Sequence, residues 1–352
     1  MALKDYLARK LIFENHPAMA PEKCLNTIQT KQECTICRDT CPHGVFDGDD
    51  PNWDLCDGCG ACVARCPTRC LRPSALLSGN ILELCNRATG DVIFACGEHS
   101  ESADLRPVCL AAIPWELIAL FALEGKVFLL MDQCENCPRK ALMCHLDDTL
   151  EDVRNFLGNE RFSSSIIRCK NSDIPSAIKQ KGMTRRDAFS LFFSKSKTTA
   201  ASLLPEDKEL TPDGMLCRRL LAHRLRGPNN NTQHLNWSIP IFQDNCSACG
   251  LCTKVCPEQA IHRIDDDAHT EPHTWYMALI PWRCTGCGIC TQSCPSQSLS
   301  PPAWTPRTDP TAPIVLPVTA LPCSRCGEPL PAGQKDGLCS RCQSEAAAPL
   351  VW

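Results

Sequence analysis

Short apolar runs alternate with longer segments of helical pattern in the middle of the chain. The runs DVIFAC at 91–96 and KVFLLMDQC at 126–134 are apolar enough to form buried strands. Between them, PWELIALFALEG at 114–125 predicts a helix that begins near Pro114 and stops at Gly125. The pattern further predicts a short strand ending at 107–109, a helix over 138–158 and a strand over 162–169. Strands that alternate with helices imply a small parallel sheet with right-handed crossovers.

Cysteines stand at or just beyond the carboxyl ends of these predicted strands. They are Cys96, Cys109, Cys134 and Cys137. The carboxyl ends of parallel strands form one edge of an open sheet, where such folds place their ligands, so we expect a metal site there. Two other interpretations stay open. Buried apolar cysteines are common in protein cores, and the pair Cys134 and Cys137, which leads into a helix, has the placement of a redox-active dithiol.

This order of strands and cysteines resembles the delta subunit of methyl-viologen-reducing hydrogenases. The resemblance implies a small α/β domain that carries a [2Fe–2S] cluster and passes electrons to a partner. That family usually has a second cysteine soon after the first strand, whereas the segment ACGEHSES at 95–102 has His99 instead. A histidine ligand therefore stays open.

Two further segments, 183–237 and 301–322, show less regular patterns than the strands and helices above. Segment 183–237 is predicted to be a helical connector, and 301–322, with seven prolines, an extended and semi-rigid linker. One side of a predicted helix in the connector carries Met215, Leu216, Leu220 and Leu225, and its other side is basic. We expect this basic side to be a solvated face, with docking to an acidic partner as the alternative. The cysteines without partner spacing are predicted to be core thiols: Cys85, Cys144, Cys169 and Cys217.

Composition narrows the class of protein. The chain has 352 residues, 29 cysteines and a formal net charge of −4, which gives no support to nucleic-acid binding because that usually needs a basic face. There is no apolar run long enough for a membrane span and no secretory signal, so we expect a cytoplasmic protein. Cysteines in a reducing compartment indicate metal ligands rather than disulfides. No dinucleotide, P-loop or catalytic-zinc motif is present.

The pattern C-x2-C-x2-C-x3-C-P occurs at 56–67, 246–257 and 284–295. It is the signature of bacterial ferredoxins, in which each fourth cysteine binds the other cluster. A zinc array is the alternative, but zinc sites favour separated C-x2-C pairs. The resemblance implies two [4Fe–4S] clusters within 238–300. One would be held by Cys246, Cys249, Cys252 and Cys294, and the other by Cys284, Cys287, Cys290 and Cys256.

Residues 1–75 resemble the same unit with an incomplete upstream half. The segment CTICRDTCP has Lys31 where a first cysteine is expected, and Cys24 is the natural substitute. The implied pairing gives one cluster to Cys24, Cys34, Cys37 and Cys66, and the other to Cys56, Cys59, Cys62 and Cys41. A three-ligand [3Fe–4S] cluster, or Cys70 as the replacement ligand, are the alternatives.

The tail contains two C-x2-C pairs in CSRCGEPLPAGQKDGLCSRC at 323–342. Four thiolates on two short loops suit tetrahedral zinc, with rubredoxin-like iron as the alternative. The ligands would be Cys323, Cys326, Cys339 and Cys342. A core this small needs the metal to fold.

We therefore predict an α+β multidomain protein with two ferredoxin-like 2[4Fe–4S] modules, an α/β parallel-sheet domain between them and a C-terminal zinc ribbon. The predicted boundaries are 1–75, 76–182, 183–237, 238–300, 301–322 and 323–352. The expected function is an iron–sulfur electron-transfer subunit that relays single electrons to other subunits of a redox complex, where any substrate chemistry would occur. Four [4Fe–4S] clusters, one [2Fe–2S] cluster and zinc are the expected cofactors. The alternatives are a thiol/disulfide reductase that uses Cys134 and Cys137, and a redox-sensing or assembly protein.

Overall fold

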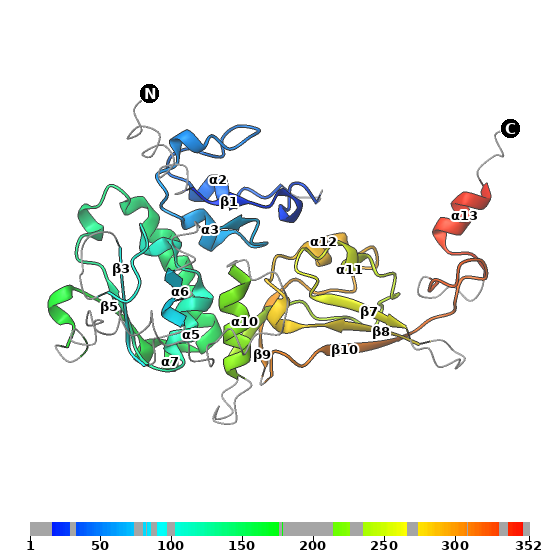
Figure 1. Ribbon diagram of the computed structural model, residues 1–352. Helices are drawn as coiled ribbons and strands as arrows, with labels where there is room; N and C mark the ends of the chain where they lie inside the picture. Colours follow the sequence, from blue (N-terminus) through cyan, green and yellow to red (C-terminus); the bar gives the residue numbers. More distant parts are fainter. Residues whose placement is uncertain are drawn as a thin grey trace, which may run out of the picture. The chain divides into compact units, whose positions relative to one another are not determined.

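The computed structural model shows two compact units of helices, strands and connecting loops (Figure 1). The residues described are 16–28, 33–73, 80–81, 83–85, 90–96, 103–175, 178, 214–225, 235–265, 274–307, 309–330 and 337–347. The first unit consists of Met1–Pro21 and Thr35–Arg224, and the second of Glu22–Cys34 and Leu225–Trp352. The cysteine run at 56–67 and the α/β domain therefore belong to the same compact unit.

A three-stranded parallel sheet lies at the centre of the α/β domain. Strands β3 (Val92–Ala95), β4 (Val127–Leu130) and β5 (Ile166–Cys169) pair in that order, which confirms the predicted parallel sheet. Helix α5 (Trp115–Ala122) forms the first crossover, and α6 (Met143–Leu157) with α7 (Asn159–Ser165) forms the second. In Figure 1 these helices lie on the same side of the sheet.

Both faces of this sheet are covered. On one face Phe94 packs edge-on against Phe121 of α5, with ring centroids 6.1 Å apart. On the other face Ile93 and Phe128 pack with Ile174, which follows β5. Every residue of β3 and β4 is buried, as parallel strands with two covered faces require.

Two predicted elements of this domain are wrong. Residues 107–109 form no strand, because Pro107 has no N–H to donate to a neighbouring strand and only Leu105 makes an isolated bridge to Phe94. Cys109 is extended instead and precedes the 3₁₀ helix η3 (Leu110–Ala112). The predicted strand over 162–169 begins only at Ile166, since the residues before it form α7.

The cysteine runs share one local structure. A five-residue helix precedes the fourth cysteine of each run, and that cysteine is extended, with ψ of 114°, 116°, 111° and 115° in chain order. The helices are α2 (Ile36–Thr40), α3 (Ala61–Arg65), α11 (Leu251–Val255) and α12 (Ile289–Ser293). The incomplete upstream run thus folds like the complete runs.

Glycine begins three of these helices for a steric reason. Gly60, Gly250 and Gly288 have φ of 77°, 72° and 76°, in the left-handed region that is free of strain only for glycine. Gly60 is the most constrained, because a Cβ there would lie 2.7 Å from the Cβ of Ala112 in η3. The N-terminal run and the α/β domain therefore approach each other closely at this point.

Antiparallel strands frame the cysteine runs. In the first unit β1 (Ala18–Met19) pairs with β2 (Leu71–Arg72). In the second unit β6 (Leu235–Ile239) pairs with β9 (Ala303–Arg307). There β8 (Thr274–Leu279) also pairs with both β7 (Ile261–Asp265) and β10 (Ile314–Thr319).

Parts of the proline-rich segment and the last residues of the predicted connector form strands. Residues 303–307 and 314–319 form strands, because each lies at a sheet edge, where proline can pair without donating a hydrogen bond on its outer side. Residues 235–237 belong to β6, where Trp237 is fully buried. Much of 183–237, including all of 183–213, lies outside the described residues.

Helix α10 (Gly214–Leu225) forms as predicted but buries a different side. Met215, Cys217, Leu221 and Ala222 are buried, and so is Arg218 at 2% exposure. The prediction that the basic side is solvated is wrong for Arg218, because Glu116 of α5 offers it a buried partner.

We predict that Gly60→Ala lowers the unfolding free energy more than Gly288→Ala does. Both changes place a Cβ at a positive φ, which costs roughly 1–2 kcal/mol. Only the first also collides with Ala112, since Gly288 has nothing closer than Pro302 at 3.8 Å. Denaturant unfolding followed by circular dichroism under anaerobic conditions measures the difference. Adding Ala112→Gly to Gly60→Ala should remove the extra loss of unfolding free energy that the collision causes. An equal loss of unfolding free energy in Gly60→Ala and Gly288→Ala would contradict the steric argument.

Candidate metal centres

In the first unit, five thiols from two runs gather near the start of α3. Burial raises the pKa of Cys62, and the thiolates of Cys59, Cys41, Cys56 and Cys37 raise it further because they lie close by. Cys41 comes from the upstream run, at the end of α2. These thiols include the crossed set that the ferredoxin resemblance implies, together with Cys37, which the resemblance assigns to the other cluster.

The second unit gathers two crossed sets in the same way. Burial, followed by Cys246, Cys249 and Cys294, raises the pKa of Cys252 to about 12. The pKa of Cys290 is likewise raised by burial, and then by Cys284, Cys287 and Cys256 among its neighbours. In both sets the fourth thiol comes from the other run. Apolar side chains five residues after each complete run's fourth cysteine are buried: Leu71, Ile261 and Leu299.

Cys294 differs from the other fourth cysteines in its hydrogen bonds. The backbone N–H of Ser298 donates to its Sγ at 3.3 Å, and the hydroxyls of Ser298 and Ser296 lie 3.5 and 3.6 Å away. Burial raises the pKa of Cys294, but these hydrogen bonds outweigh burial and leave the pKa below its usual value. Cys256 accepts a backbone N–H from Ala260 at 3.2 Å. Hydrogen bonds to cluster sulfurs are one determinant of potential.

The remaining predicted set is Cys24, Cys34, Cys37 and Cys66, and this grouping stays a prediction. The structure does connect the segments around its first two members. The Asn26 side chain donates to the Cys34 carbonyl at 2.9 Å and accepts the Cys34 N–H at 2.7 Å. This pair of bonds closes the loop that the prediction inserts after Cys24. Lys31 lies outside the described residues, and Cys70, the alternative ligand, is buried.

The four thiols of the α/β domain also gather. Burial, followed by the thiolates of Cys96, Cys109 and Cys137, raises the pKa of Cys134 to about 11. Cys96 follows β3, Cys134 begins the 3₁₀ helix η4 (Cys134–Asn136) after β4, and Cys137 ends it. Cys96 and Cys134 thus follow the carboxyl ends of two neighbouring strands, and Cys109 reaches them from a loop. His99, the alternative ligand, lies outside the described residues.

Arg139 joins this group of thiols to the N-terminal run, and sequence reasoning missed it. Its backbone N–H donates to Cys137 Sγ at 3.4 Å, and its Nε donates to Asp57 Oδ2 at 2.5 Å. Asp57 in turn accepts the Cys59 N–H at 3.0 Å. Burial lowers the pKa of Arg139, but Asp57 and the thiolates of Cys59 and Cys109 raise it overall. The guanidinium thus lies near both thiol groups.

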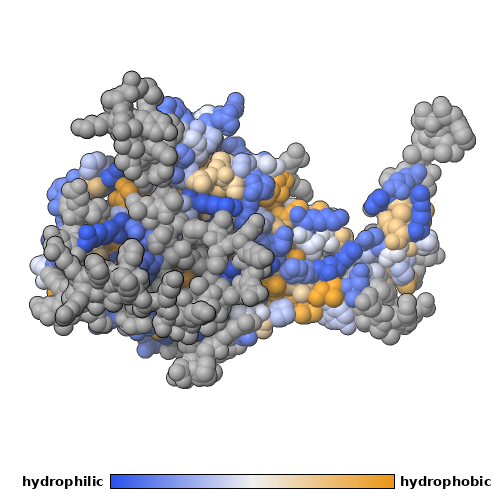
Figure 2. Space-filling model, viewed as in Figure 1, coloured by the Kyte–Doolittle hydropathy of each residue, from blue (hydrophilic) through white to orange (hydrophobic). Residues whose placement is uncertain are grey.

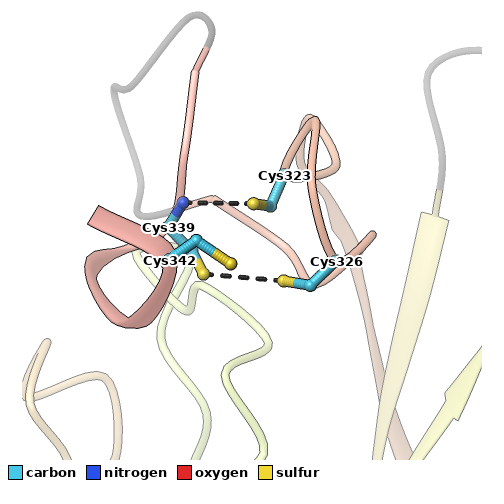
Figure 3. Close-up of side chains that lie close together, drawn as sticks. All are labelled: Cys323, Cys326, Cys339 and Cys342. Atoms are coloured by element: carbon cyan, nitrogen blue, oxygen red, sulfur yellow. Dashed lines mark hydrogen bonds between the residues drawn. The ribbon is translucent and has the colours of Figure 1, made fainter. Parts of the chain in front are cut away.

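The four tail cysteines form the tightest group. The Sγ atoms of Cys323, Cys326, Cys339 and Cys342 all lie within 4.8 Å of one another, so they could hold a metal ion (Figure 3). The Cys339 N–H donates to Cys323 Sγ at 3.3 Å, and it contributes most among several hydrogen bonds that lower the pKa of that thiol to about 6. Besides these thiols, the local core contains only Leu330 and Leu338 among the described residues.

The predicted core thiols divide into three kinds. Cys217 is buried as predicted, and Cys85 and Cys169 are half-buried. Cys144 is exposed, so its prediction is wrong. It stands near the start of α6 on the side opposite Leu146, Leu150 and Val153, which are the buried positions of that helix.

Comparison with protein families finds two iron–sulfur domains, one over the N-terminal cysteine run and one over the two runs of the second unit. Residues 245–298 match the 4Fe-4S dicluster domain, and residues 50–72 match the 4Fe-4S binding domain. No curated protein and no solved structure matches the chain. The chain therefore contains two ferredoxin-type 4Fe-4S domains, which suggest iron–sulfur electron transfer. Among the described residues, no helix is both long enough and apolar enough to cross a membrane.

We predict that iron loss in double variants reveals the crossed ligands. Cys294→Ala combined with Cys246→Ala should remove about four iron atoms, because both thiols would hold one [4Fe–4S] cluster. Cys294→Ala combined with Cys284→Ala should remove about eight, because the two would hold different clusters. Iron and sulfide analysis of anaerobically assembled protein measures this. The exposed Cys144→Ala is the control, and the reverse pattern would show uncrossed ligation.

For the tail, we predict one tightly held metal ion whose removal unfolds α13 (Ser340–Ala347). The small local core leaves most of the folding energy to the metal. Cys326→Ser or a chelator should release the ion and speed amide hydrogen exchange in α13, whereas Ser324→Ala should do neither. Metal analysis distinguishes zinc from iron. Unchanged exchange after metal loss would show that the tail folds without it.

Proposed function

We propose that this protein is an electron carrier that relays single electrons between subunits of a larger oxidoreductase. Four [4Fe–4S] clusters would be held by the crossed sets of cysteines, and each would take up or release one electron. The residues of this chain hold the clusters, set the distances between them and tune their potentials. The observation that carries the proposal is the connection through Arg139 between two groups of thiols.

This connection is short and made of directional contacts. Cys137 Sγ accepts the Arg139 N–H, the Arg139 guanidinium binds Asp57, and Asp57 accepts the Cys59 N–H. Nearby, Gly60 leaves no space for a side chain against Ala112. Two independent structural metal sites would not need such an approach. Two centres that exchange electrons would, because electron transfer weakens steeply with distance.

The thiols of the α/β domain suit a [2Fe–2S] cluster better than a dithiol reductase. A binuclear cluster would use all four, Cys96, Cys109, Cys134 and Cys137. A reductase needs only the last two, and one of them must have a lowered pKa. Here burial and three neighbouring thiolates raise the pKa of Cys134 to about 11. A reactive thiolate at that position is therefore disfavoured.

The second unit offers a place for electrons to leave or enter. Cys249 is exposed, unlike the other members of its crossed set, and the exposed Leu251 follows it. Figure 2 shows hydrophobic residues at the visible surface of this unit. An exposed cluster ligand close to an exposed leucine suits contact with a redox partner. We propose that this partner is a protein subunit, and that the tail holds zinc in a purely structural role.

The proposal predicts about 16–18 iron atoms per chain, the number that four cubane clusters with or without a binuclear cluster contain. It also predicts that Cys96→Ser or Cys109→Ser abolishes one non-cubane signal in the electron paramagnetic resonance spectrum of reduced protein. The signals of the cubane clusters should remain, because their thiols are unchanged. Cys144→Ser, at an exposed thiol, is the matched control.

Other outcomes would favour the alternatives. A metal-free α/β domain with a Cys134–Cys137 disulfide in oxidised protein, detected by mass spectrometry, would favour a reductase. Iron of about eight atoms or fewer in fully assembled protein would contradict the relay of four cubane clusters. It would leave a redox-sensing or assembly role as the better explanation.

A further inference from the structure

The four cysteine runs differ at one equivalent position. The third residue after each fourth cysteine has a left-handed backbone: Gly44, Arg69, Gln259 and Gln297, with φ of 65°, 55°, 49° and 50°. Both glutamines are exposed. Arg69 is buried, with 6% of its surface exposed. The chain therefore places a buried cation beside one fourth cysteine, Cys66, and neutral exposed amides beside two others.

Helices α3 and α5 contact the Arg69 side chain, and α10 joins them through a shared carboxylate. Its guanidinium donates to the carbonyl of Ala64 in α3 at 3.3 Å and to Oε1 of Glu116 in α5 at 2.5 Å. Arg218 of α10 donates to the same carboxylate oxygen at 3.2 Å. Glu116 is 0% exposed and Arg218 is 2% exposed. This network, Arg69–Glu116–Arg218, contains two cations and one anion, so it carries a net positive charge.

The network lies against a cluster-binding segment. Ala64 stands between Cys62 and Cys66 on α3, so the guanidinium contacts the helix that ends at Cys66. Burial lowers the pKa of Arg69, but Glu116 and then Cys66 raise it, and the pKa stays above its usual value. Arg69 is therefore charged at every pH of interest. A buried charge is screened much less by salt than an exposed charge.

We infer that Arg69 raises the reduction potential of the cluster that holds Cys66, and that Glu116 and Arg218 set the size of this effect. Reduction adds one negative charge to a cluster, so a fixed positive charge nearby stabilises the reduced form. Net charge and hydrogen bonds are the protein's main means of setting such potentials. The inference rests on the proposed function, because it requires a cluster at Cys66. Arg69 acts as a tuning residue and is not a ligand.

The test is a potentiometric titration of the full chain, assembled anaerobically and followed by electron paramagnetic resonance. Arg69→Gln introduces the residue that the two runs of the second unit carry with the same backbone conformation. It should lower the midpoint potential of one cluster, and Arg218→Gln should lower it less. Glu116→Gln should raise it, because it removes the anion and leaves both cations. A merely structural network would not give shifts of opposite sign.

Arg69→Lys and Gln297→Arg serve as controls. Arg69→Lys keeps the charge and should retain most of the potential. Gln297→Arg adds a cation at the equivalent exposed position, so any shift should disappear at high salt, whereas the Arg69→Gln shift should persist. If Arg69→Gln loses iron, the opposite shifts expected for Glu116→Gln and Arg218→Gln still decide the matter.

Three results would overturn the inference. One is an unchanged potential in Arg69→Gln protein with full iron content. Another is a pair of shifts in the same direction for Glu116→Gln and Arg218→Gln. In both results the clusters are present, so the proposed function survives. The third is protein without iron after assembly, which would overturn the proposed function together with this inference.

Discussion

Gathered thiols create an electrostatic constraint on which the rest of this structure depends. Thiols such as Cys62 and Cys290 are buried beside four other cysteines, and both burial and like charge raise their pKa. Such a group must stay protonated or bind a cationic centre, because uncompensated buried charges are strongly destabilising. An iron–sulfur core solves this problem for widely spaced thiols, and a single metal ion solves it for the compact group in the tail.

The local part of this solution could be predicted from sequence. Each run brings its thiols together within about a dozen residues. The cysteine spacing and the glycines at positions such as Gly60 and Gly288 therefore suffice to predict the local backbone of each run. Strands β3 and β4 were equally clear, because both are apolar at every position. The upstream run folds in the same way although it lacks its first cysteine, since α2 and the extended Cys41 do not require that residue.

The features that could not be predicted from the sequence depend on contacts between residues far apart in the chain. Arg69 and Glu116 are 47 positions apart, and Asp57 and Arg139 are 82 apart, so no local pattern connects them. Proline content predicted a linker where β9 and β10 form, because edge pairing depends on strands elsewhere in the chain. The basic side of α10 suggested solvent for Arg218, because the buried carboxylate that pairs with it lies on another helix. In each case the partner, rather than the residue itself, decides the structure.

The same distant contacts explain how the N-terminal run and the α/β domain are joined. Arg65 binds Asp148 and Asp152, Arg69 binds Glu116, and Arg139 binds Asp57, so charged pairs occur repeatedly between the two. Exposed pairs contribute little to stability, and buried pairs often contribute no more than apolar residues of similar size would. Stability alone therefore does not account for these contacts. For Arg69, the inferred effect on potential supplies a further reason: a cation beside Cys66 would favour the reduced state of a cluster bound there, which an apolar interface cannot do.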